Sequence, residues 1–84
     1  MIKTIKNRVE RYFGKEIKTI DDVKTIVDKL NEVPSPRTKR KIVSDLFDIC
    51  LFMFDVKGAK EFVKYAKRKG IRVYDYSKYF RKQV

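Results

Sequence analysis

The sequence predicts an all-α protein, a compact bundle of four helices over about residues 2–13, 20–33, 36–55 and 58–69, with a short C-terminal tail. Two observations lead to this class. Apolar residues recur three and four positions apart within each segment, which places them on one face of a helix. Gly or Pro residues mark the boundaries between segments. With 84 residues, the chain is expected to form one domain, residues 1–84, around a modest core.

The first two segments carry local signals for the ends of helices. Residues 2–13 have an apolar and a polar face, and Gly14 follows as a left-handed stop. The second helix, residues 20–33, begins after Thr19, and Asp22 lies three positions further on, which is an acidic variant of the capping box. The proline that follows is expected to end this helix, because a residue before proline is pushed out of the α region.

The third segment, residues 36–55, is predicted to be the central helix. Ser35 is a favourable N-cap and Pro36 a favourable first helical residue. Its last turns are apolar on nearly all sides, and a helix of this kind is surrounded by protein. The aromatic residues expected in the core are Phe47, Phe52, Phe54 and Phe62.

Gly58 is expected to separate the central helix from a fourth helix, residues 58–69. The tail after Gly70 remains open between two structures. Residues 71–76 alternate between apolar and polar side chains, as in a short strand, whereas Asp75 or Ser77 could cap a last helical turn that carries Tyr79 and Phe80.

Positive charge is the main indication of function. The chain has 22 Lys and Arg against 11 Asp and Glu, a net charge of +11 and a pI near 9.9, which favours a polyanionic partner. Ten of the basic residues and only two of the acidic ones lie in residues 57–84. A second basic cluster, Arg37–Lys41, stands at the start of the central helix.

The second cluster is unfavourable for an isolated helix, because a helix N-terminus already carries partial positive charge. An anion would reverse that cost, and free backbone N–H groups there would help to bind a phosphate. We therefore predict a surface that binds nucleic acid, most of all double-stranded DNA. Its predicted residues are Ser35, Arg37, Thr38, Lys39, Arg40, Lys41, Lys60, Lys64, Lys67, Arg68, Lys69 and Arg72. A lysine stripe such as that of residues 60–67 is equally typical of a solvated helix face.

The composition argues against an enzyme. The chain has no His, one Cys and no nucleophile or phosphate-loop motif, so we predict no catalytic residues, no metal site and no cofactor. Cys50 lies in an apolar run and is expected to be a buried thiol. The spacing of Asp45, Asp48 and Asp55 invites a metal hypothesis, but we expect these acids to form ion pairs with Lys41 or with lysines of the fourth helix.

The sequence shows no apolar signal-peptide region and no apolar run near the ~20 residues of a membrane span. We therefore expect no membrane partner and a cytoplasmic protein, nucleoid-associated if it binds DNA. Asn, Gln and His are scarce while Lys, Ile and Val are abundant, a bias that resembles hyperthermophile proteins.

The stretch SPRTKRKIVSDLFDICLFMF resembles the last helices of the core-binding (SAM-like) domain of tyrosine recombinases. TIDDVKTIVDKL is similar to the helix before them, and TIKNRVERYFGKEIKTI to the first helix and loop of that domain. The resemblance covers about residues 4–54. It implies a four-helix clamp over one face of DNA, in which Ser35, Arg37, Thr38 and Lys41 match the polar start of the DNA-facing helix.

The chain departs from that family after residue 54. The family usually leaves the domain through an Asn-Pro-like exit, whereas here Asp55-Val56-Lys57-Gly58 leads into another basic helix. No Arg/His/Tyr catalytic set follows, so the resemblance implies DNA binding without recombination.

Two other functions remain open. The central helix has more apolar surface than a chain of this size is expected to cover, which fits a protein-interaction module or a homodimer. Five residues near the end of the chain, Tyr65, Tyr74, Tyr76, Tyr79 and Phe80, are interleaved with Lys and Arg. Such a mixture also fits stacking on the bases of single-stranded nucleic acid or RNA.

Overall fold

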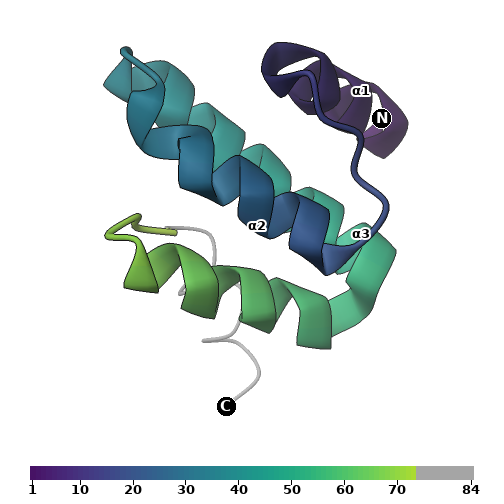
Figure 1. Ribbon diagram of the computed structural model, residues 1–84. Helices are drawn as coiled ribbons and strands as arrows, with labels where there is room; N and C mark the ends of the chain where they lie inside the picture. The colour runs from purple at the N-terminus through teal and green to yellow at the C-terminus, as the bar shows by residue number, and fades with distance from the viewer. Residues whose placement is uncertain (74–84) are drawn as a thin grey trace.

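Three α-helices make up most of residues 1–73, the part of the chain that the computed structural model describes (Figure 1). They are α1 (Ile2–Phe13), α2 (Ile20–Lys29) and α3 (Pro36–Arg68), and a short 3₁₀ helix, η1 (Leu30–Glu32), follows α2. No strand is present in this part of the chain. The all-α class is therefore confirmed, and the second predicted helix ends as a 3₁₀ turn.

The prediction of four separate helices was wrong. The third and fourth predicted helices form one 33-residue helix, α3, with a sharp kink at Asp55. Asp55 alone has non-helical angles within α3, with φ 60° and ψ −168°. One residue is enough to reverse the direction of the chain, so no loop separates the two parts. The part after Asp55, drawn in green, runs back toward the end at which α3 begins (Figure 1).

The reversal depends on the absence of a side chain at Gly58. A Cβ atom built there would lie only 2.1 Å from the Cβ of Phe54 and 3.6 Å from the carbonyl oxygen of Cys50. Gly58 and its neighbour Ala59 are buried. These two small residues therefore let the second part of α3 pack directly on the end of the first part.

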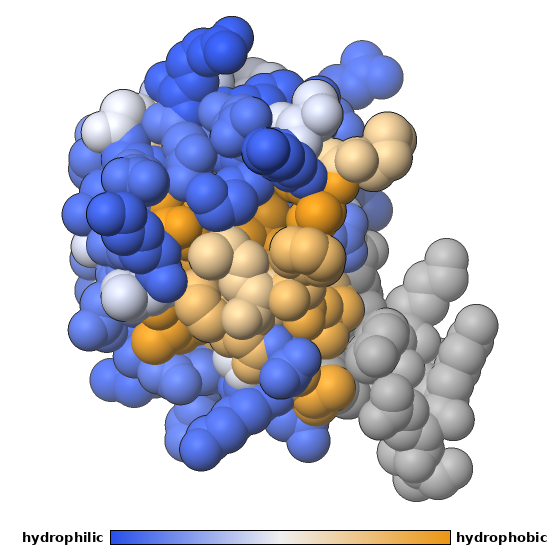
Figure 2. Space-filling view, turned by 90° about the vertical axis from the view of Figure 1, so that its right-hand side faces the viewer, coloured by the Kyte–Doolittle hydropathy of each residue, from blue (hydrophilic) through white to orange (hydrophobic). Residues whose placement is uncertain are grey.

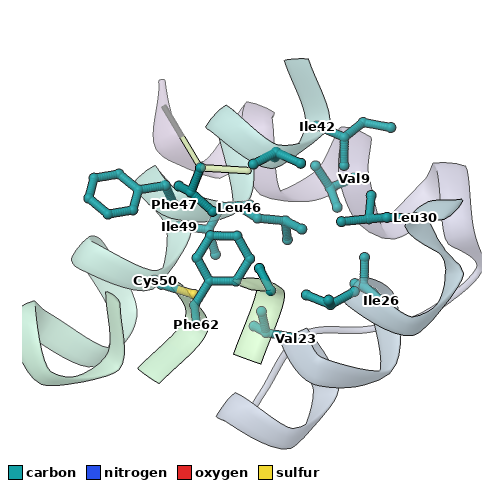
Figure 3. Close-up of a cluster of buried hydrophobic side chains, with 14 of the residues drawn as sticks. Val9, Val23, Ile26, Leu30, Ile42, Leu46, Phe47, Ile49, Cys50 and Phe62 are labelled. Carbon is teal, nitrogen blue, oxygen red and sulfur yellow. The ribbon is translucent and has the colours of Figure 1, made fainter. Parts of the chain in front are cut away.

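Both shorter helices pack against α3, as expected for a central helix. The core contains Val9 from α1, residues such as Ile26 and Leu30 from α2 and η1, and both parts of α3 (Figure 3). From α3, Leu46 and Phe62 are fully buried. The second part of α3 thus completes the same core to which the first part belongs.

The core prediction was wrong at Phe52. Its side chain is 69% exposed, whereas Phe47 and Phe62 are buried and Phe54 is half-buried. The kink at Asp55 lies on the right-hand side of Figure 1, and apolar residues gather into a patch when the molecule is viewed from that side (Figure 2). The last turn of the first part of α3 is therefore not enclosed on all sides.

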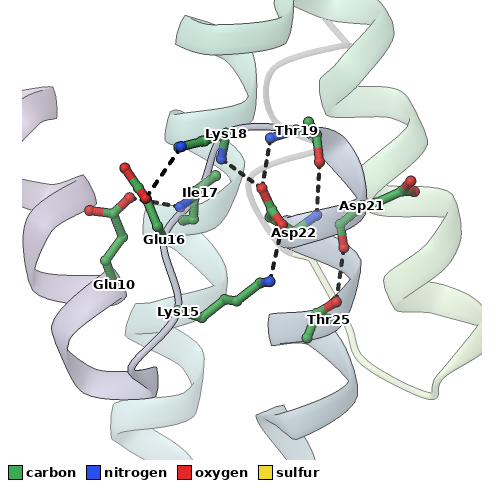
Figure 4. A network of polar contacts seen from close by, with 9 residues as sticks. All are labelled: Glu10, Lys15, Glu16, Ile17, Lys18, Thr19, Asp21, Asp22 and Thr25. Atoms are coloured by element: carbon green, nitrogen blue, oxygen red, sulfur yellow. Dashed lines mark hydrogen bonds and ion pairs between the residues drawn. The ribbon is translucent and has the colours of Figure 1, made fainter.

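Two carboxylates, those of Glu10 and Asp22, hold the connection between α1 and α2 (Figure 4). Glu10 Oε2 accepts hydrogen bonds from the backbone N–H of Ile17 and from Lys6 Nζ, both at 2.7 Å. These bonds lower the pKa of Glu10, the backbone bond having the larger effect. The contact fixes Ile17, whose side chain is buried in the core.

The predicted capping box at the start of α2 is confirmed. Thr19 Oγ1 accepts from the N–H of Asp22, and Asp22 Oδ2 accepts from the N–H groups of Thr19 and Lys18 at 2.9 and 2.8 Å (Figure 4). The bonds from Lys18 and Thr19 lower the pKa of Asp22 to about 2 from the usual 3.8, and Lys15 contributes further.

The tail prediction is only partly covered by the structure. Residues 71–73 form no regular helix or strand, and the side chains of Ile71 and Val73 are buried. Asp75 and the rest of the predicted alternating segment lie outside the described residues.

We predict that Gly58→Ala lowers the free energy of unfolding by about 2–3 kcal/mol, because the added methyl group overpacks the kink against Phe54. Denaturant titration followed by circular dichroism measures this. Lys57→Ala, at the exposed neighbouring position, is the control and should change stability by no more than about 0.5 kcal/mol. Equal stability of both variants would contradict the close packing at Gly58.

We also predict a pH dependence from the capping box. Because the pKa of Asp22 is lower in the folded protein, its carboxylate stabilises the fold fully above pH 4, and this contribution disappears as the pH falls toward 2. The Tm difference between the wild type and Asp22→Asn should therefore be largest above pH 4 and shrink toward pH 2. Asp21→Asn removes the same charge from the same turn and controls for general electrostatics. A Tm difference for Asp22→Asn that does not change with pH would rule this out.

Candidate nucleic-acid interface

Two backbone N–H groups in the first turn of α3 already donate hydrogen bonds to the N-cap residue, Ser35. Ser35 Oγ accepts from the N–H of Thr38 at 3.2 Å, and the Ser35 carbonyl oxygen accepts from the N–H of Lys39 at 2.9 Å. Pro36 has no N–H to offer. The expectation that free backbone amides form a phosphate site here is therefore largely wrong. An anion near this end would be held chiefly by side chains.

The reversal of α3 brings the two basic clusters of the sequence together. A groove of about 400 Å³ separates the first turns of α3 from the segment that follows α3. Basic residues of both clusters line it. The lining residues are Pro36, Arg37, Lys39, Arg40, Val43, Gly70, Ile71 and Arg72. Four of the predicted binding residues thus line one groove, although Arg72 lies more than 30 positions away from the other three in sequence. We call it the basic groove.

Asn31 of η1 connects the two sides of the basic groove. Its Oδ1 atom accepts from Lys39 Nζ at 2.7 Å, and its Nδ2 atom donates to the carbonyl oxygen of Lys69 at 3.4 Å. Lys39 is consequently half-buried. The sequence alone does not indicate a role for Asn31. The one available signal was that amides are rare in this chain.

The predicted stripe along the second part of α3 lies on its outer face. Ala59, Phe62 and Ala66 are fully buried, whereas Lys60, Lys64, Lys67 and Arg68 are exposed. Within residues 1–73, neither Lys64 nor Lys67 forms an ion pair. The stripe therefore presents positive charge to solvent along two turns of helix.

Tyr65 uses two of the predicted binding residues for packing. The guanidinium of Arg68 lies 6.0 Å from its ring centroid, and Lys69 Nζ lies 5.4 Å from it. The Tyr65 hydroxyl donates to Asp28 Oδ1 at 2.7 Å, and Lys69 is 3.5 Å from the same oxygen. This ring therefore stabilises the contact with α2, which disfavours its use for stacking on bases. Tyr74, Tyr76, Tyr79 and Phe80 lie outside the described residues.

The same face of α2 holds α3 by an ion pair. Lys24 Nζ lies 2.8 Å from Glu61 Oε2, and this contact raises the pKa of Lys24 and lowers that of Glu61. Glu61, an isolated acid within the basic second part of α3, is therefore directed toward α2. It does not neutralise the outer stripe.

A second and larger groove, of about 620 Å³, lies between α1 and the first turns of α3. Its rim is basic and its floor contains apolar residues. It is lined by Arg8, Val9, Tyr12, Arg37, Thr38, Arg40, Lys41, Ile42, Val43, Ser44 and Asp45. We call it the α1–α3 groove. Sequence reasoning found its α3 side but missed Arg8 and Tyr12. The Tyr12 side chain, on α1, is 53% exposed.

A buried carboxylate stands in the α1–α3 groove. Asp45 is only 7% exposed, and its Oδ2 atom lies 3.3 Å from Arg8 Nη2. The partner of Asp45 is thus Arg8, and for this residue the prediction of a pair with Lys41 or with lysines beyond the kink was wrong. The ion pair connects α1 to α3 across the groove.

Little else in residues 1–73 suggests chemistry. Cys50 is fully buried, and desolvation raises the pKa of its thiol to about 12, so it is a structural thiol in the folded protein. No group of three or more potential metal ligands occurs in this part of the chain. Within the same residues, no helix has both the length and the apolar character needed to cross a bilayer.

Comparison with protein-family models, with curated proteins and with solved structures gives no match. The resemblance to the core-binding domain of tyrosine recombinases stays a prediction. The two grooves and the outer stripe are therefore the features from which a function can be inferred.

Proposed function

We propose that this protein binds duplex DNA through the basic groove and the outer stripe of α3. One observation carries the proposal: Arg37, Lys39 and Arg40 line the same groove as Arg72. A polyanion that lies across the groove would meet positive charge on both of its sides, and this favours binding.

The stripe supports a duplex as the partner. Lys60 and Lys67 are seven residues apart, which corresponds to about 10 Å along the helix axis at 1.5 Å per residue. Three base pairs of B-DNA extend a similar length, about 10 Å at 3.4 Å each. Lys64 lies between them on the same exposed face. This stripe would contact phosphates, which position a protein on DNA without reading its sequence.

Sequence reading, if it occurs, would come from the first turns of α3. Arg37 and Arg40 are exposed, and arginine side chains can bind guanine edges with two hydrogen bonds. Lys39 is less suited, because it is bonded to Asn31. We therefore assign phosphate contacts to the stripe and base contacts to Arg37 and Arg40.

We predict that Lys64→Glu/Lys67→Glu weakens duplex binding on every sequence and reduces the slope of log K against log salt by about 2, because about 0.9 counterions are released per phosphate contact. Fluorescence anisotropy across a salt series measures both quantities. Lys3→Glu/Lys29→Glu removes the same charge from exposed positions on α1 and α2 and is the matched control.

Equal effects of the two double variants would show that binding depends on net charge alone. That result would contradict the assignment of the stripe as a binding surface. Absence of wild-type binding at low salt would contradict the proposal altogether. A preference for single strands or RNA in competition would replace the duplex as partner.

A second candidate function, self-association, is favoured by the apolar patch near the kink (Figure 2). Phe52 is 69% exposed and its neighbours Leu51 and Met53 are half-buried. If the patch joins two copies, sedimentation velocity should show a dimer that Phe52→Ser converts to monomer, because a buried aromatic anchor is lost. A wild type that stays monomeric at high concentration would exclude this function.

A further inference from the structure

We propose that the α1–α3 groove binds one nucleoside 5′-phosphate, with its base stacked on Tyr12, its phosphate on the basic rim and guanine preferred through Asp45. The proposal rests on the proposed function for the class of ligand. It concerns the neighbouring groove, which shares Arg37, Arg40 and Val43 with the basic groove. A groove of about 620 Å³ has the size of a small-molecule pocket and cannot admit a duplex.

The lining of the groove is both apolar and basic, and one class of ligand matches both properties. Val9, Ile42 and Val43 give the groove an apolar floor, and the half-exposed ring of Tyr12 stands at its side. An inorganic anion would leave this apolar surface unused. A nucleobase would cover it and stack on the ring, as bases do on exposed aromatic residues of nucleic-acid-binding proteins.

The rim supplies the charge for a phosphate group. Arg8, Arg37, Arg40 and Lys41 all line the groove, against the single carboxylate of Asp45. Arg37 and Lys41 lie one turn apart on α3 and form no ion pair within residues 1–73. An uncharged aromatic ligand would leave these cations without use, so the lining favours an aromatic anion.

Asp45 adds a preference among the bases. Its carboxylate is more than nine-tenths buried, and one oxygen is held by Arg8 at 3.3 Å. An ionised carboxylate only accepts hydrogen bonds. Guanine presents two adjacent N–H donors on its Watson–Crick edge, whereas the same edge of adenine has one donor beside an acceptor. A buried carboxylate at the base position therefore selects guanine.

The ligand chemistry has two possible sources, a free mononucleotide and an unpaired nucleotide within a strand. Both offer a base and a phosphate on one ribose. GMP and a short single-stranded oligonucleotide with one guanine represent the two sources. Tighter binding of the oligonucleotide at the same amides would identify the strand as the source, and equal or tighter binding of GMP the free nucleotide.

The test is a titration of the full-length protein followed by ¹H–¹⁵N NMR. GMP should cause saturable shifts at the amides of Tyr12, Thr38 and Ser44, with guanosine and inorganic phosphate each at least about tenfold weaker. AMP and IMP should also bind about tenfold less tightly, because each loses a donor to Asp45. These comparisons use the wild type alone and so do not depend on the folding of a variant.

Variants then locate the ligand. Tyr12→Ala should weaken GMP binding about 5- to 150-fold through loss of stacking, and Tyr12→Phe, which keeps the ring, should not. Asp45→Asn should abolish the preference for GMP over AMP. Arg11→Ala, at an exposed position on α1 outside the lining, is the control for general effects on this helix.

The outcomes separate this proposal from the previous one. GMP binding without duplex binding would overturn the proposed DNA function and keep the groove. Duplex binding without saturable GMP shifts, or phosphate binding as tightly as GMP, would overturn the groove proposal alone. An unchanged GMP affinity in Tyr12→Ala would also overturn it.

Discussion

The close contact between Gly58 and Phe54 is the constraint on which the rest of the structure depends. Without a Cβ at residue 58 the chain can reverse at Asp55 and keep its helical hydrogen bonds on both sides. The second part of α3 then buries Ala59, Phe62 and Ala66 against the core formed by the first part, α1 and α2. A single helix thereby supplies two layers of a small protein, and the short α1 and α2 suffice to cover it.

The same reversal organises the charge. A straight helix of 33 residues would be about 50 Å long and would hold its two basic clusters at opposite ends. Folded back, it brings Arg37 and Arg40 to one groove with Arg72, and Asn31 bridges the two sides. The shared groove is therefore a consequence of core packing. Burial of apolar residues holds these cations at one groove, where a bound polyanion would contact both sides.

Local signals could be predicted from the sequence, and relations between helices could not. The Thr19–Asp22 capping box and the Ser35 cap were found because each depends on neighbouring residues only. Gly58 indicated a break, but the pattern does not distinguish a loop from a kink. Phe52 was misplaced because apolar spacing shows which residues can be buried, not which have neighbours. The basic clusters were visible in the sequence as charge. Arg8, Tyr12 and Asn31 lie at the two grooves only because of how α1 and η1 pack on α3, which the sequence pattern does not show.

The most direct test of the folded-back helix is a nuclear Overhauser measurement between η1, which precedes the start of α3, and Gly70, which follows its end. In the folded-back structure the Asn31 side-chain amide contacts the Lys69 carbonyl, so its protons should show a cross-peak to the backbone amide proton of Gly70. Glu32 does not take part in this contact and offers an internal comparison. An absent Asn31–Gly70 cross-peak, together with uninterrupted helical cross-peaks through Asp55, would show a straight α3 and contradict both the core and the joined basic surface.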